Sequence, residues 1–151
     1  MRYYADQPDM KPWPIADTDN GALFYDLSFF VPGPARAKQS FRYGRNGHSF
    51  QSARVKGWQA DVGWAAQQAM RVYVDHLEKF PLHGDIAVEL IFLMKNKYSA
   101  DGDNLSKAIL DALNGIVWDD DQKVIDLHIR KVNAVESQRA GVNVMIKEIK
   151  P

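Results

Sequence analysis

The chain has no cysteine, and this absence excludes a disulfide framework as well as any zinc site built on thiolates. Its four histidines lack the spacing of metal ligands, so a bound metal would need oxygen donors. No apolar run approaches the roughly 20 residues that cross a bilayer, and the N-terminus lacks the pattern of a signal peptide. We therefore expect a cytoplasmic protein that has no membrane partner.

Acidic residues are also missing from Leu27 to Ala60, a stretch that carries six basic residues. These are Arg36, Lys38, Arg42, Arg45, Arg54 and Lys56. The balance reverses from Tyr98 to Gln122, where six aspartates accompany the single Lys107. Two solvated surfaces of opposite charge would explain this segregation. A basic surface that grips a polyanion beside an acidic site that cleaves it would explain it equally well.

The length of 151 residues and the hydrophobic content of 46% predict a single domain with its own core. Residues 1–22 contain three prolines and no periodicity, so they are expected to form a poorly structured extension before a domain of residues 23–151. The expected fold is α/β (α+β), with one long and one short helix packed on a small mixed β-sheet.

Alternating or continuous apolar patterns predict four strands, and a small hairpin is expected around the Asn46-Gly47 turn. The four strands are Leu23–Val31, Asp85–Met94, Val124–Val132 and Gly141–Ile149. The strand Asp85–Met94 contains few polar residues, so it should lie in the centre of the sheet and be covered on both faces. Apolar residues at three- and four-residue steps predict a long helix from Ser52 to Lys79. Residues 136–139 are expected to join the last two strands as a hairpin loop.

A short helix is predicted from Asn104 to Asn114, with Asp103 as its N-cap and Gly115 just beyond its end. Its apolar side would carry Leu105, Ile109, Ala112 and Leu113. Its polar side would carry Asp103, Lys107 and Asp111. The simplest role for Lys107 is an ion pair with an aspartate one helical turn away. The alternative role is to neutralise the charge of a bound phosphate.

Asp101 and Asp103 lie two residues apart, so in an extended segment both carboxylates would reach one cation. Asp120 would complete the set after the chain turns back at Gly115. Spacing alone leaves open which of the three consecutive aspartates, 119–121, points inward. A helix cap followed by a surface turn would explain the Asp-Gly-Asp sequence without any metal.

The chemistry that such a cluster supports is the hydrolysis of phosphodiesters. This reaction needs an activated water and neutralisation of the charge on the phosphate and on the leaving oxygen. One or two Mg²⁺ ions held by carboxylates supply both, and a nearby lysine adds to the neutralisation. An acidic cluster in a chain with a separate basic stretch therefore favours a nuclease over a dehydrogenase or a protease.

Three runs of the sequence, DGDNLSKAILDALNG, WDDDQ and VIDLHIRK, together resemble the RusA family of Holliday junction resolvases. The resemblance implies a homodimer that binds four-way DNA junctions and makes paired nicks with Mg²⁺, or with Mn²⁺. By position in these runs, it implies that Asp101, Asp103 and Asp120 bind the metal. It also implies that Lys107 is essential for catalysis.

The hypothesis from the sequence is a structure-selective endodeoxyribonuclease that acts in DNA recombination and repair. The residues expected to grip DNA are Lys38, Arg42, Arg45, Arg54 and Lys56. Within that segment, residues 39–42 (Gln-Ser-Phe-Arg) differ from the Arg-Pro-Arg-like run that the family usually has. Two alternatives stay open: a metal-dependent phosphoesterase acting on small nucleotides, and a non-enzymatic DNA-binding module whose acidic patch contacts a protein.

Overall fold

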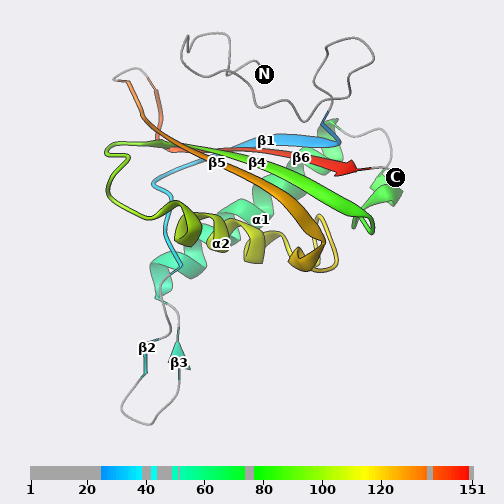
Figure 1. The fold of residues 1–151 in the computed structure, drawn as a ribbon, viewed down its shortest axis with the longest axis horizontal. Coiled ribbons are helices and arrows are strands. Elements are labelled where there is room, and N and C mark those ends of the chain that lie inside the picture. Colours follow the sequence, from blue (N-terminus) through cyan, green and yellow to red (C-terminus); the bar gives the residue numbers. More distant parts are fainter. Residues whose placement is uncertain are drawn as a thin grey trace.

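The computed structural model describes residues 25–38, 42–43, 49–50, 52–73, 77–135 and 138–149. The extension predicted for residues 1–22 lies outside these ranges, as does Arg45. Only the backbone is described for Arg42, which belongs to a short antiparallel pair formed by β2 (Arg42–Tyr43) and β3 (Ser49–Phe50). This pair confirms that the chain forms a hairpin here. In Figure 1 the hairpin projects away from the sheet, beyond the start of the long helix.

The centre of the fold is a four-stranded mixed sheet in the order β1-β6-β4-β5. Its strands are β1 (Leu27–Pro32), β4 (Asp85–Met94), β5 (Val124–Asn133) and β6 (Gly141–Ile149). Strand β4 runs parallel to β5 and antiparallel to β6, and β6 also pairs antiparallel with β1. The structure therefore confirms a small mixed sheet with a central β4.

The predicted hairpin between the last two strands is wrong, because β4 lies between β5 and β6. The burial of the strands gives the physical reason. Nine of the ten residues of β4 are buried, so this apolar strand needs a neighbour on each side. Strand β5 alternates apolar with polar and charged residues and is largely half-buried or exposed, which suits the edge of a sheet.

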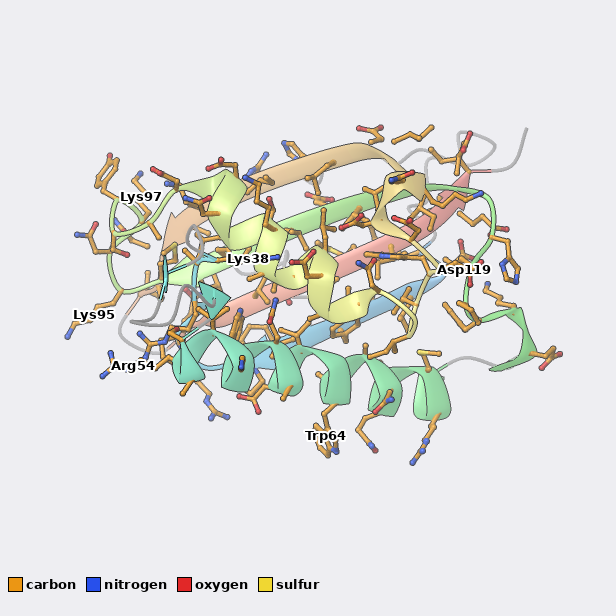
Figure 2. All side chains as sticks on the ribbon, turned by 90° about the horizontal axis from the view of Figure 1, so that it is seen from below. Lys38, Arg54, Trp64, Lys95, Lys97 and Asp119 are labelled. Atoms are coloured by element: carbon orange, nitrogen blue, oxygen red, sulfur yellow. The ribbon has the colours of Figure 1, made fainter. Side chains whose placement is uncertain are left out.

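Two helices cover one face of the sheet, α1 (Ala53–Tyr73) and α2 (Gly102–Leu113). In the view from below in Figure 2, α2 lies under the β4 and β5 side of the sheet, and α1 lies under the β1 side. The predicted N-cap of α1 is confirmed, since the Ser52 hydroxyl accepts the backbone N–H of Val55 at 3.3 Å. The helix ends at Tyr73 rather than Lys79, and Leu77–Lys79 form a separate 3-10 turn, η1.

The hydrophobic core lies between this face and the two helices. The buried stripe of α1 contains Val55, Trp58, Val62, Ala66 and Ala69. The buried side of α2 contains Leu105, Ala108, Ile109 and Leu113. Alternate residues of β4 (Ile86, Val88, Leu90 and Phe92) complete the core. Because each fully buried large aliphatic side chain contributes roughly 1.5–3 kcal/mol, this layer fixes the orientation of α2 and leaves its opposite side in solvent.

Candidate active site

The first turn of α2 carries two exposed aspartates. The helix begins at Gly102 with Asp101 as its N-cap, so the prediction that Asp103 caps the helix is wrong by two residues. The Asp101 carbonyl already accepts the N–H of Leu105 at 3.0 Å, while its carboxylate makes no capping hydrogen bond. Asp103 lies within the first turn, where a negative charge interacts favourably with the helix dipole.

The exposed side of α2 continues with Lys107. Its ammonium lies 3.9 Å from the Asp103 carboxylate, and the two side chains are 61% and 71% exposed. Such an exposed pair at one-turn spacing is weak, which leaves both groups available to a ligand. The structure therefore confirms the predicted polar side of the helix, on which Asp103 and Lys107 are neighbours.

Lys38 joins the segment after β1 to α2 by two contacts. Its backbone N–H donates to the Asn104 carbonyl at 3.0 Å, and its ammonium forms an ion pair with the Asp111 carboxylate. Both side chains of the pair are only partly exposed, at 25% and 31%. The sequence predicted that Lys38 contacts DNA, whereas in this structure its charge is directed to an aspartate of the last turn of α2.

Trp118 fixes the chain that carries the three consecutive aspartates. It is completely buried, and its indole N–H donates to the Asn114 side chain at 2.8 Å. The turn between them depends on Gly115, whose φ of 76° is readily adopted by glycine. The N–H of Leu82, just before β4, donates to the Val117 carbonyl at 2.7 Å. The aspartates are thereby held at the C-terminal end of α2.

Each of the three aspartates has a different environment. Asp119 contacts the His83 ring at 2.6 Å, and it lies at the end of the molecule shown on the right in Figure 2. Asp120 accepts the backbone N–H of Gln122 at 2.9 Å and so caps the 3-10 turn η2 (Asp121–Lys123). Asp121 is half-buried, whereas Asp119 and Asp120 are exposed.

Asp121 is electrostatically coupled to its neighbours. Burial raises the pKa of its carboxyl above the ordinary 3.8, and the negative charge of Asp111 raises it further. A hydrogen bond to Asp120 and the charge of that residue act in the same direction, while a hydrogen bond to Asn114 lowers the pKa. Asp111, Asp120 and Asp121 therefore form a concentration of negative charge that a proton or a cation would relieve.

The predicted ligands lie at opposite ends of α2. Asp103 and Asp111 are eight residues apart, which corresponds to about 12 Å along the helix axis, and Asp121 lies beside Asp111. Within the described residues, no three acidic or imidazole side chains lie close enough together to hold a metal ion. A single chain in this conformation thus does not bring Asp101, Asp103 and Asp120 together, and their role as shared metal ligands stays a prediction.

The reason is topological. We expected the Gly115 turn to bring the chain back toward the start of the helix. Instead the turn leads into β5, which starts beside the beginning of β4, at the end where α2 finishes. The start of α2 is held near the opposite end of β5, where the Lys131 ammonium donates to the Ala100 carbonyl at 2.9 Å.

Basic side chains gather near the start of α1. Arg54 and Lys56 are both exposed in its first turn. Figure 2 shows Arg54, Lys95 and Lys97 toward the same end of the molecule, away from Asp119. Lys97 also lies 5.3 Å from the ring centroid of Tyr98, which is 80% exposed. This Lys-Asn-Lys-Tyr run, residues 95–98, ends three positions before Asp101 and was not among the DNA-binding residues expected from the sequence.

The family model described as endodeoxyribonuclease RusA matches residues 32–147. The chain belongs to the RusA endodeoxyribonuclease family. This confirms the resemblance seen in the sequence, and it places the protein among nucleases, which hydrolyse the phosphodiester bonds of DNA. The RusA match includes both ends of α2 and the three consecutive aspartates. No curated protein matches the chain significantly.

Two features of this RusA-family site were missed from the sequence. Asp111 was placed on the polar side of the helix, but its pairing with Lys38 joins residues 73 positions apart, which no local pattern reveals. Trp118 was seen only as part of a motif, although a tryptophan before three aspartates signals an anchor.

In the part of the chain that the structure describes, no helix combines the length and the apolar character needed to span a membrane.

Proposed function

We propose that this RusA-family nuclease resolves four-way DNA junctions by metal-dependent hydrolysis of the phosphodiester backbone. The observation that carries this proposal is the exposed side of α2, where Asp101, Asp103 and Lys107 face solvent and the ion pair between Lys107 and Asp103 is exposed and weak. Carboxylates in this state are free to bind a cation, and the lysine is placed one helical turn farther along.

The donor chemistry fits a hard divalent cation, Mg²⁺ or Mn²⁺, because the aspartates offer only oxygen ligands. When bound, such an ion would activate a water and neutralise charge on the phosphate. Asp101 and Asp103 would hold it from one end of α2. For the third ligand, Asp120 is the position implied by the motif, and the negative charges of Asp111 and Asp120 beside Asp121 would also favour a cation there.

The separation of about 12 Å along α2 suggests how the ligands would meet. A second copy of the chain, with its α2 running in the opposite direction, would bring its aspartates 120 and 121 toward Asp101 and Asp103 of the first. A two-fold assembly of this kind makes two equivalent sites, as paired nicks in a symmetric junction require. We therefore propose a homodimer as the active species.

Basic residues of the chain would then neutralise the reacting phosphate and bind the DNA backbone. The Lys107 ammonium would compensate the negative charge that grows on the phosphate oxygens. Arg54 and Lys56 would hold the DNA backbone, together with Arg42 and Arg45, as expected from the sequence. Because these contacts are with phosphates, DNA binding should weaken steeply as salt is raised.

The test compares a synthetic four-way junction with a linear duplex of the same sequence, each with Mg²⁺ or with EDTA, at two salt concentrations. The proposal expects paired nicks in the junction only, and only with Mg²⁺. Hydrolysis of small nucleotides without junction cleavage would contradict the proposal and indicate a phosphoesterase instead. Junction binding without cleavage under any metal condition would also contradict the proposal and indicate a non-enzymatic DNA-binding module.

A further inference from the structure

The connection between β4 and α2 presents a tyrosine ring to solvent. Tyr98 is 80% exposed, which is the largest exposure of any large hydrophobic side chain in the part of the chain that the structure describes. The ring therefore adds little to the core. A single exposed ring is ordinary on a protein surface, so its support and its neighbours decide whether it has a further role.

The turn that carries Tyr98 is held by hydrogen bonds. The side-chain oxygen of Asn96 accepts the Tyr98 backbone N–H at 3.0 Å, and the Asn96 carbonyl accepts the Ser99 hydroxyl at 2.7 Å. The backbone N–H of Lys97 donates to the Asn133 side chain at 2.8 Å, which joins the turn to the end of β5. Because the turn is already ordered, little backbone freedom is lost when its ring binds a ligand.

The surroundings of the ring are basic. The Lys97 ammonium lies over the Tyr98 ring, 5.3 Å from its centroid, and Lys95 is exposed. Residues 95–100 contain no acidic side chain. In Figure 2, Lys95 and Lys97 lie toward the same end of the molecule as Arg54. A ligand that fits this turn combines negative charge with a flat apolar face.

A strand of nucleic acid has both properties. Its phosphates would contact the lysines, and the face of a base would stack on the ring, which is how proteins commonly bind unpaired bases. An apolar pocket of a protein partner would also accept a tyrosine. Such a pocket gives no role to the two lysines beside it, so the combination favours DNA.

The position of Tyr98 links this contact to the acidic end of α2. Tyr98 precedes Asp101 by three residues, which span at most about 10 Å. Successive bases of a duplex strand are about 3.4 Å apart along its axis. A base stacked on Tyr98 would therefore lie within a few nucleotides of a phosphate bound near Asp101. The Lys131 ammonium, which donates to the Ala100 carbonyl at 2.9 Å, holds the intervening segment.

Stacking on Tyr98 distinguishes branched from linear DNA. In a linear duplex both faces of each internal base are covered by its neighbours, so stacking on a protein ring requires that the base be pulled out of the stack. The free-energy cost is lower where the continuous stack is already interrupted, as at the branch point of a junction. An aromatic side chain in this position would therefore favour branched DNA without reading its sequence.

We propose that Tyr98 stacks on a nucleobase at the branch point of the DNA, with Lys95 and Lys97 against the neighbouring phosphates, and that this contact contributes to the selectivity for branched DNA. The inference rests on the proposed function for its substrate, the four-way junction. The contact itself is one of binding and requires neither a metal ion nor cleavage.

Binding in EDTA tests the contact without cleavage. For the full-length Tyr98→Ala variant, affinity for a synthetic four-way junction should fall at least roughly fivefold, while affinity for the matched linear duplex changes by less than about twofold. Tyr98→Phe keeps the ring and should bind like the wild type, whereas Tyr98→Leu should bind like the alanine variant. Trp64→Ala is the matched control, because Trp64 is also an exposed aromatic residue, at 65%, on α1.

Salt dependence separates the ring from the lysines. Tyr98→Ala removes no charge, so the slope of log affinity against log salt should equal that of the wild type. Lys97→Met should make this slope shallower by about one unit, as expected when one phosphate contact is lost. A changed slope for Tyr98→Ala would mean that the variant disturbs phosphate contacts, and it would overturn the stacking contact.

Removal of the base provides the complementary test. Abasic sites are introduced one at a time at the nucleotides that flank the branch point. At one of these positions the wild type should lose about as much affinity as Tyr98→Ala loses on the intact junction, and the alanine variant should lose little more, because the two changes remove the same contact. Additive losses at every position would overturn the proposal.

The outcomes separate the stacking contact from the proposed function. Unchanged junction binding by Tyr98→Ala, or equal losses on the junction and the linear duplex, would overturn the contact even if the wild type cuts junctions. Coupling between Tyr98 and an abasic site, in a protein that cuts no junction with Mg²⁺ or Mn²⁺, would support the contact and contradict the proposed function.

Discussion

The two ends of α2 carry similar residues in different electrostatic states. At the N-terminal end, Asp101 and Asp103 are exposed, and Lys107, which pairs with Asp103, is itself exposed. At the C-terminal end, Asp111 is paired with a half-buried lysine, and Asp121 has a raised pKa. The first end is ready for a ligand from outside, and the second is stabilised by groups of the chain itself.

The comparison shows that counting carboxylates along a sequence does not locate a metal site. Six aspartates lie within 22 residues, yet one helix separates them into two groups. In a single chain each group lacks what the other has. The N-terminal group has free oxygens but too few of them, whereas the C-terminal group has several oxygens that are already hydrogen-bonded or ion-paired.

The largest expected effect comes from the N-terminal end. Asp103→Asn removes a proposed metal ligand without changing shape, so junction cleavage should fall at least roughly 100-fold while junction binding persists. The measurement is single-turnover cleavage of a labelled four-way junction. Asp61→Asn is the matched control, because Asp61 is also exposed, on α1, and far from the motif in sequence. Equal activity of the two variants would remove Asp103 from the site.

The next effect concerns the anchor of the C-terminal end. Trp118→Ala empties a fully buried site and leaves the Asn114 amide oxygen without its donor, so unfolding should become easier by roughly 3–5 kcal/mol. Trp118→Phe keeps a ring and should cost less, roughly 1–2 kcal/mol. Chemical denaturation measures both. If Trp118→Ala leaves the free energy of unfolding unchanged, another contact must hold the aspartates in place.

A smaller effect is expected for the ion pair between Lys38 and Asp111. Lys38→Met removes the cation beside a group of aspartates and should destabilise the protein by about 1 kcal/mol at neutral pH. In a double-mutant cycle, adding Asp111→Asn should recover part of this loss, because the repulsion disappears with the charge. Lys56→Met, at an exposed position of α1, should leave stability unchanged. Additive losses would show that the two residues do not interact.

Much of the fold was predictable because its patterns are local. The central strand and the last strand were assigned with the bounds that the structure has, since continuous or alternating apolar residues define them. The buried side of α2 followed from its helical spacing. The order of the strands did not follow, because the pairing of β4 with both β5 and β6 depends on contacts between distant segments.

The candidate site was predictable in its residues and not in its geometry. The motif identified Asp101, Asp103 and Lys107, and their exposure agrees with a functional role. The position of Asp120 depended on the path of the chain after Gly115, and that path is set by Trp118 and by the bridge to Leu82. A sequence shows that the chain turns there, but not to which strand it turns.

The smallest expected effect is the pH dependence of Asp121. Its folded pKa is raised above 3.8 by burial and by the charge of Asp111, so folding favours the protonated carboxyl. That contribution is fully present below pH 3.8 and is lost as the pH rises through the folded pKa. Asp121→Asn stays neutral at every pH. In EDTA its melting temperature should therefore exceed that of the wild type at pH 7 and equal it near pH 3.

Asp119→Asn provides the comparison for this measurement, because Asp119 contacts His83 instead of another aspartate. It should not show the same gain at pH 7. If Asp121→Asn instead lowers the melting temperature at pH 7, the Asp121 charge is stabilised by the fold, and the repulsion that distinguishes the two ends of α2 does not exist. If Mg²⁺ raises the melting temperature of the wild type more than that of Asp121→Asn, a bound cation reduces the electrostatic repulsion at the Asp121 carboxylate, as a proton does.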